Sequence, residues 1–276
     1  WVVFDAAVPP LFFAAVRFLG VAVCLVPFLR PIPKDLKTLF LISFFIGSGH
    51  FALLFVGLAN AEASAAAVVG QMGVPFATLM SMAFLGETIG WRRGLGIMLA
   101  FAGVLLIAVD PGSFTISFGL LYIGAAAFVG AVGGILMKRM SPVTALQSQA
   151  WIGLFSFAPL FVVSALLERG QVGSYIAGGW WVWIATAFAV VGVSIFGHGG
   201  FYHLIKKYDI SLLSPLTLMT PIWGVVLSII LLNEAITPQL ILGSAISLGG
   251  VLIIALRPNK TLPDAGVVKK LGSGGS

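Results

Sequence analysis

An all-α membrane protein with many bilayer-crossing helices is the fold class that the sequence predicts, on three observations. Hydrophobic residues make up 59% of the chain, charged residues make up 9%, and the mean hydropathy is +1.10, which leaves too little polar surface to coat a water-soluble globule. Apolar runs of about 17 to 24 residues recur along the chain, and each can cross a hydrocarbon core of about 30 Å as a helix. The runs lack the apolar–polar alternation of β-barrel strands, which favours helices over a barrel.

The breaks at charged residues and at Pro/Gly predict nine complete spans. These are residues 9–29, 37–57, 63–85, 93–109, 117–137, 144–167, 180–202, 210–232 and 240–256. The links between them are short, and the longest runs from Glu168 to Gly179. We therefore expect no inserted soluble domain.

Lysine and arginine are concentrated in alternate loops, and the opposite set of loops carries only Arg169. Because cytoplasmic loops retain basic residues, we expect the basic loops and the C-terminus to lie in the cytoplasm. The net charge of +6 is then explained without a nucleic-acid partner. The basic loop residues are Arg30, Lys34, Lys37, Arg92, Arg93, Lys138, Arg139, Lys206, Lys207, Arg257, Lys260, Lys269 and Lys270.

The chain also repeats itself. The stretch ETIGWRRGLGIMLAFAGVLLIA, from Glu87, and the stretch EAITPQLILGSAISLGGVLIIA, from Glu234, share the glutamate, two glycines at equal offsets and the ending G-V-L-x-I-A. Pro75 lies near Pro221 in this register, and the Gly-His pair at His50 falls on the Gly-His pair at His198. The spaced glycines predict packing surfaces, inside one chain or between two.

The span at 117–137 has no intact partner ahead of the first full span, so we expect the first helix to be largely missing from this chain. Five helices per repeat place the two halves in opposite orientations, as the loop charges independently require. The sequence thus predicts a ten-helix inverted 5+5 repeat. Residues 1–110 would form the first repeat, 111–257 the second, inverted repeat, and 258–276 a cytoplasmic tail ending in a Gly/Ser linker.

This doubled motif resembles the drug/metabolite transporter superfamily, specifically its EamA-type ten-helix transporters, and PPLFFAAVRF at residues 9–18 is similar to the second helix of that family. The resemblance covers nearly the whole chain. It implies a multi-pass protein of the bacterial inner membrane with a central cavity. It also implies export of amino acids and related compounds, including aromatic ones as in the YddG-like group.

Polar side chains inside the spans are the candidate site residues, because they must face protein or a wet cavity. His50 lies mid-span, and His198 recurs at the equivalent position of the other repeat, so we expect both to line a shared midplane cavity. The alternative is a neutral imidazole that bonds a carbonyl of a neighbouring helix. Gln71, one turn before Pro75, has a ligand-binding or a structural role.

Two tryptophans complete the expected substrate-binding set. Trp151 and Trp223 lie mid-span, away from the interfacial belt, where their rings either pack or wall an amphipathic metabolite. The set predicted to bind substrate is His50, Gln71, Trp151, His198 and Trp223.

A second group of residues is expected at the cavity, at its vestibule or in structural positions at helix ends. Arg17 lies about a third of the way into its span, where its length favours a structural anchor over substrate contact. Tyr202 and His203 line the cytoplasmic vestibule or anchor the interface. Glu87 and Glu234 are helix-end carboxylates expected to bond the amides that start the next helix, and with Pro75 and Pro221 they form the structural hallmark.

The sequence disfavours an enzyme, a cofactor and a metal site. No G-x-x-x-x-G-K-[ST] loop is present, and three histidines at separate depths without a carboxylate cluster do not form a metal or hydrolytic centre. A phosphorylated sugar would favour two or more cationic side chains near the midplane, where only Arg17 is available. A lipophilic cation would favour an intramembrane carboxylate, and none is visible.

The sequence therefore predicts a secondary transporter that exports small amino acids or amino-acid-like metabolites by alternating access. Exchange or a proton gradient would drive it, and the protein would be a monomer or a weak homodimer. The alternatives are a drug exporter of broad range and a non-transporting membrane scaffold.

Overall fold

The structure is a computed structural model that describes residues 8–86, 88–109, 116–140, 143–200, 204 and 217–256. Within these ranges the regular elements are helices, and an isolated antiparallel bridge joins Val109 and Ile116. Seven helices of the described part are long and apolar enough to cross a membrane: Leu36–Leu58, Ala63–Leu85, Trp91–Ala108, Phe118–Arg139, Ala145–Leu167, Gly179–His198 and Pro238–Ala255. Two shorter apolar helices, Pro10–Cys24 and Met219–Leu232, occupy the other two predicted spans.

The first half contains four spans, several of which change helix type along their length. Their elements are α2 (Pro10–Cys24) with η1 (Val26–Leu29); α3 (Leu36–Ile42), η2 (Ser43–Gly49) and α4 (His50–Leu58); α5 (Ala63–Val69), η3 (Gly70–Met72) and α6 (Gly73–Leu85); and α7 (Trp91–Ala108).

The second half has longer helices. Its elements are α8 (Phe118–Arg139), α9 (Ala145–Leu167), α10 (Gln171–Ala177), α11 (Gly179–Ala187) with η4 (Phe188–His198), α14 (Met219–Leu232) and α15 (Pro238–Ala255). The short helix α10 lies in the longest of the predicted links, Glu168 to Gly179. It follows Gly170, which has φ of 69°, and its Tyr175 hydroxyl lies 3.1 Å from the hydroxyl of Thr186.

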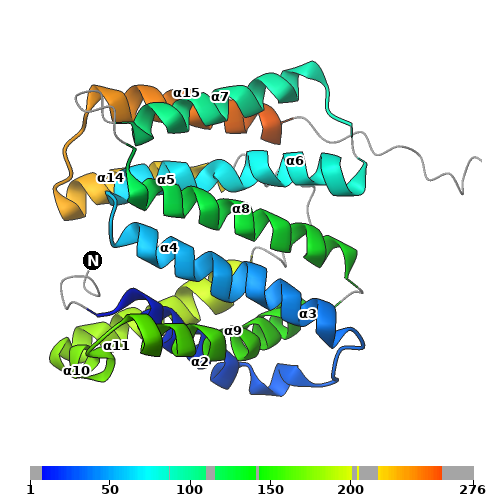
Figure 1. Cartoon of the computed structure of the whole chain (residues 1–276), viewed down its shortest axis with the longest axis vertical. Helices are drawn as coiled ribbons and strands as arrows, with labels where there is room; N and C mark the ends of the chain where they lie inside the picture. The colour runs from blue at the N-terminus through cyan, green and yellow to red at the C-terminus, as the bar shows by residue number, and fades with distance from the viewer. Residues whose placement is uncertain are drawn as a thin grey trace, which may run out of the picture.

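The spans alternate in direction, so the described charged loop residues, except Asp35 and Arg169, segregate by sign to two ends of the helix array. We call one the basic end, which carries Arg30, Arg92 and Lys138, and the other the acidic end, which carries Glu62, Glu168 and Glu234. The acidic end lies at the left of Figure 1. In that view α7 and α15 form one edge of the array, α2 and α9 lie at the opposite edge, and α8 lies between α4 and α6.

Helices α7 and α15 pack closely because the repeated glycines face each other. A Cβ on Gly96 would lie 2.8 Å from the Gly250 carbonyl oxygen, and a Cβ on Gly243 would lie 2.8 Å from the Gly103 carbonyl oxygen. These pairs run in opposite directions along the two helices, so α7 and α15 are antiparallel. The predicted glycine packing surface is therefore used inside one chain, where only glycine allows so close an approach.

Helices α2 and α9 form the corresponding antiparallel pair at the other edge. A Cβ on Gly153 of α9 would lie 3.0 Å from the Phe18 carbonyl oxygen and 3.0 Å from the Ala22 amide nitrogen of α2. Small buried polar groups add hydrogen bonds between helices, as is usual in membrane proteins. For example, the Ser156 hydroxyl donates to the Ser43 carbonyl oxygen at 3.0 Å, which links α9 to η2.

Candidate functional site

Each half contains a π-helical segment that leads to one of the two intramembrane histidines. The first, η2, ends at Gly49, and His50 follows it directly as the first residue of α4. The second, η4, ends at His198. A π-helix departs from the i to i−4 hydrogen-bond pattern, and such departures occur frequently at functional sites. The matched irregularity therefore marks the same place in both halves.

The His50 ring is oriented by a hydrogen bond to a neighbouring helix. Its Nδ1 lies 2.7 Å from the carbonyl oxygen of Ala126 on α8. Because a carbonyl can only accept, Nδ1 carries the proton, and the neutral imidazole presents Nε2 as an acceptor. Gly130 makes room for this contact, since a Cβ there would lie 2.9 Å from Nδ1. This bond is the structural alternative considered for His50, and it leaves one ring nitrogen for another partner.

Arg17 links the two halves next to this histidine. Its side chain is 4% exposed, and its Nε donates to the Ser194 hydroxyl of η4 at 3.1 Å. The guanidinium carbon lies 4.3 Å from the centroid of the Phe51 ring on α4, within cation–π range. Ser194 in turn donates to the carbonyl oxygen of Ala189 at 2.9 Å. Neither Ser194 nor Phe51 was expected as a partner, because these contacts depend on how the two halves pack.

His198 belongs to the same group of side chains. It is exposed, and it lies close enough to Arg17 and His50 to interact electrostatically with both. We call the group formed by Arg17, His50, Ser194 and His198 the Arg17 cluster. It draws side chains from α2, α4 and η4, so two of its members come from each half of the chain.

The other predicted binding residues lie apart from this cluster in the described contacts. Trp151 is buried on α9 and packs on Phe155 with ring centroids 5.2 Å apart, while its Nε1 has no hydrogen-bond partner among the described residues. Gln71 is half-buried on η3, and Trp223 on α14 is 55% exposed. No hydrogen bond or ring contact between described residues joins these three side chains to the Arg17 cluster.

The hallmark prolines occupy matching places in the two halves. Pro75 and Pro221 are each the third residue of a helix, in α6 and α14, and both are fully buried. A proline is tolerated in a first turn because its missing N–H would have no partner in the helix.

Three residues singled out in the sequence, Tyr202, His203 and Glu87, lie outside the described residues.

At the acidic end, Glu234 stabilises the start of a helix in the other half. Its carboxylate accepts from the backbone amides of Ala63 at 2.7 Å and Ser64 at 2.9 Å, which begin α5. The expected partner was the next helix, α15, which is capped by the Thr237 hydroxyl instead. Burial raises the pKa of Glu234, but the hydrogen bonds from Ser64 and Ala63 outweigh it and hold that pKa below its ordinary value.

Glu168 has the same role at the start of α2, and the sequence analysis did not single it out. Its carboxylate accepts from the amides of Leu11 at 2.8 Å and Phe12 at 3.0 Å, and from the Ser164 hydroxyl at 2.6 Å. Its position, directly after an apolar span like that of Glu234, was the available signal. Both carboxylates thus fasten a helix of the first half to the second half at the acidic end.

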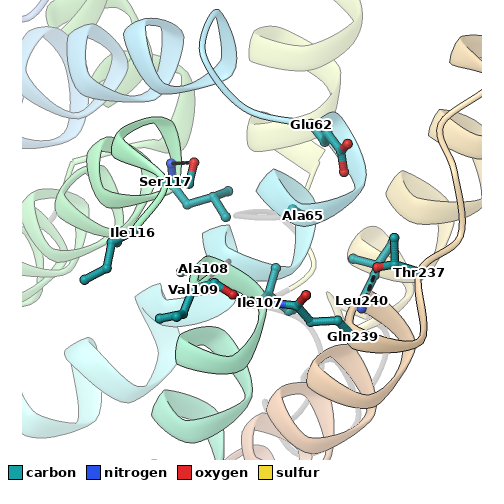
Figure 2. Close-up of a pocket in the computed structure, with 11 residues that line it drawn as sticks. Glu62, Ala65, Ile107, Ala108, Val109, Ile116, Ser117, Thr237, Gln239 and Leu240 are labelled. Carbon is teal, nitrogen blue, oxygen red and sulfur yellow. Dashed lines mark hydrogen bonds between the residues drawn. The ribbon is translucent and has the colours of Figure 1, made fainter. Parts of the chain in front are cut away.

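A cavity lined by described residues opens at each end of the array. The one at the acidic end has a volume of about 500 Å³ and lies among α5, α7, α8 and α15, with Glu62, Ser117 and Gln239 on its walls (Figure 2). The one at the basic end has a volume of about 740 Å³ and is bounded by the ends of η1, α9 and η4. Its lining includes Ile195 of η4 and Gly199, the residue directly after His198. None of the five predicted binding residues lines either cavity.

Comparisons with known proteins agree with this architecture. The model of the EamA-like transporter family matches residues 2–109 and 114–256. A probable amino-acid metabolite efflux pump of Escherichia coli (strain K12) is 28% identical over 254 residues, covering 89% of this chain and 85% of the pump. A probable terminal-alkyne amino-acid exporter of Streptantibioticus cattleyicolor is 24% identical over 232 residues, covering 83% of this chain and 76% of the exporter.

A solved structure described as "Crystal structure of protein" superposes with a TM-score of 0.62. The alignment covers 91% of this chain and 90% of that one at 22% sequence identity. This likeness shows the fold.

Proposed function

The chain belongs to the EamA-like transporter family of the drug/metabolite transporter superfamily, and from that premise we propose that it exports small amino acids or amino-acid-like metabolites, aromatic ones included. The family makes it a multi-pass membrane transporter. The names of two relatives, an amino-acid metabolite efflux pump and an amino-acid exporter, support an efflux role and this class of cargo.

The observation that carries the proposal is the Arg17 cluster, because it combines both halves at one intramembrane place. A site built from two halves can be exposed to one side of the membrane and then the other when the halves rock against each other. His50 offers Nε2 and Arg17 offers its Nη groups, in apolar spans that supply few other polar atoms. Gln71, Trp151 and Trp223 are proposed to complete the walls of the cavity during transport.

We further propose an inner-membrane location with the basic end in the cytoplasm, together with the C-terminus. The asymmetry of lysine and arginine supports this orientation. The acidic end, with its two carboxylate caps and the cavity of Figure 2, would then face outward.

Residues 1–110 and 111–257 are proposed as the two inverted repeats, and the antiparallel pairing of α7 with α15 supports that division. Exchange or a proton gradient would supply the driving force.

Counterflow in proteoliposomes tests the proposed function. Vesicles containing the protein are preloaded with neutral, aromatic and sulfur-containing amino acids, and the accumulation of labelled amino acid is followed. The proposal predicts accumulation for part of the panel, which is lost in the His50→Ala variant. Asn60→Ala is the matched control, because Asn60 lies just after the same helix and, among the described residues, its exposed side chain bonds only the Val56 carbonyl oxygen.

Flat accumulation across the panel would overturn amino-acid export. Accumulation of a lipophilic cation in the same vesicles would then identify a drug exporter, and no accumulation of either kind would favour a scaffold. If His50 only packed, the His50→Ala variant would lose folded protein and transport together. Size-exclusion elution and thermal unfolding of the purified variant separate that outcome from a loss of transport alone.

A further inference from the structure

Arg17 carries a fixed positive charge inside the helix array, and no carboxylate of the described residues balances it. The side chain is 4% exposed. The acidic residues that the structure describes are Asp35, Glu62, Glu168 and Glu234, and all four lie at helix ends rather than inside a span. A buried cation without a counter-ion is costly, and inside a membrane such a group usually marks a substrate or ion pathway.

The internal partners of Arg17 leave most of its hydrogen-bonding capacity unused. A guanidinium has five N–H donors in a planar fork, and here Nε donates to Ser194. Phe51 attracts the charge through the face of its ring but accepts none of the in-plane N–H groups as a carboxylate would. In the described part of the chain, the two Nη groups therefore have no acceptor. A planar bidentate anion fits that fork.

The described residues around Arg17 supply hydrogen-bonding groups but no negative charge. The hydrogen bond to Ala126 fixes the proton of His50 on Nδ1, so Nε2 of the neutral imidazole is an uncharged acceptor, and the Ser194 hydroxyl accepts from Arg17 and donates to Ala189. Among the described residues nothing acidic lies near Arg17 to neutralise an ammonium group. As far as the described residues define it, the site carries the single positive charge of Arg17, which favours a ligand with one negative charge and no positive charge.

We propose that Arg17 binds a carboxylate of the cargo, and that the site selects monoanionic carboxylates whose amino group is blocked or absent at least as well as free amino acids. The inference rests on the proposed transport function and narrows its substrate class. A free amino acid offers the same carboxylate, but its ammonium finds only neutral acceptors here. An amino-acid amide, which keeps the ammonium and lacks the carboxylate, is repelled by Arg17.

Ligand-dependent thermal unfolding of the purified full chain in detergent tests this selectivity directly. The probes are phenylalanine, N-acetylphenylalanine and phenylalaninamide, together with the three corresponding leucine compounds. For the unmodified protein, the free and N-acetylated acids of at least one series should raise the unfolding midpoint in a saturable way. The N-acetylated acid should bind as tightly as the free one or more tightly, and the amide should give no shift.

Two variants locate the site at Arg17. Arg17→Gln should weaken binding of both acids about tenfold or more, the loss expected for charge-assisted hydrogen bonds, while Arg17→Lys, which keeps the charge without the fork, should weaken it less. Arg92→Gln is the matched control, since it removes a basic residue at the exposed start of α7 and should leave binding unchanged. If Arg17→Gln fails to fold, the comparison of acid with amide on the unmodified protein still decides the question.

The outcomes separate this inference from the proposed function. Equal shifts by acid and amide, no shift by any acid, or unchanged acid binding in folded Arg17→Gln would each overturn it. Counterflow of phenylalanine and leucine that is equal in unmodified and Arg17→Gln protein would leave amino-acid export standing and overturn the carboxylate site. Arg17-dependent binding of N-acetylated acids without counterflow of free amino acids would support the site and overturn amino-acid export.

Discussion

The carboxylate of Glu234 and the backbone amide of Ala63, 171 residues apart in sequence, are joined by a 2.7 Å hydrogen bond. This bond places a negative charge at the start of α5, where the partial positive charge of the helix terminus favours it. Glu168 places a second charge at the start of α2. The two contacts hold the halves together at the acidic end, so each cap forms only while the two halves keep this relative position.

Glu234→Gln is expected to lower the free energy of unfolding by about 1 kcal/mol, the usual scale for loss of a charged helix cap. Because the pKa of Glu234 is lowered in the folded protein, its contribution is present above the ordinary value of 4.5 and is lost as the pH falls through the folded pKa. The measurement is the thermal unfolding midpoint at pH 7 and pH 4, and the variant should differ from the unmodified protein less at the lower pH.

Glu62→Gln is the control for this cap. Glu62 occupies the position just before α5, yet its side chain makes no capping hydrogen bond and is exposed. Its removal should leave the midpoint nearly unchanged. If Glu62→Gln were as destabilising as Glu234→Gln, the effect would come from general charge at the acidic end and not from the cap.

Gly250→Ala is expected to destabilise the protein by about 1 to 3 kcal/mol, because the added methyl group overpacks the contact between α7 and α15. Its Cβ would lie 2.5 Å from the Ala100 amide nitrogen and 2.5 Å from the Gly96 carbonyl oxygen, and backbone atoms cannot move aside as a side-chain tip can. Gly249→Ala is the matched control, since nothing lies within 4 Å of a Cβ there. Equal thermal unfolding midpoints for the two variants would show that α7 and α15 tolerate separation.

The spans were predictable because bilayer thickness fixes how long an apolar helix must be. The prediction of 63–85 corresponds to α5 through α6, Ala63–Leu85, and the prediction of 144–167 differs by one residue from Ala145–Leu167. The glycine spacing indicated a packing surface but not its partner. The partner is the matching glycine surface of the other half, since α7 and α15 lie side by side (Figure 1).

The partners of the candidate site were less predictable, because they depend on contacts between the halves. The sequence marked His50 and Arg17 as polar groups in apolar runs, but it gave no reason to select Ser194 from the many serines of the chain. Glu234 was expected to cap the helix that follows it, whereas its actual partner, α5, lies in the other half. Helix α10 escaped prediction because it is a single short segment held by Tyr175, whose hydroxyl meets Thr186.

Phe51→Leu should destabilise the protein by about 1 kcal/mol more than Phe55→Leu does. Both changes remove a ring from the same helix, and both rings have aromatic neighbours, but only Phe51 also faces the guanidinium of Arg17 at 4.3 Å. A cation–π contact shielded from water contributes on this scale. The thermal unfolding midpoints of the two purified variants provide the comparison. Equal losses would mean that the Phe51 ring contributes only apolar packing.

Gly130→Ala is expected to reduce transport while leaving stability almost unchanged. Its Cβ would lie 2.9 Å from Nδ1 of His50, and the imidazole can rotate away, which breaks the bond to Ala126 without moving a backbone. Loss of one oriented hydrogen-bonding group should raise the substrate concentration for half-maximal counterflow about fivefold. Gly134→Ala, about one turn further along α8 with nothing within 4 Å of its Cβ, should change neither property. Unaltered counterflow in Gly130→Ala would show that transport does not require the ring orientation set by Ala126.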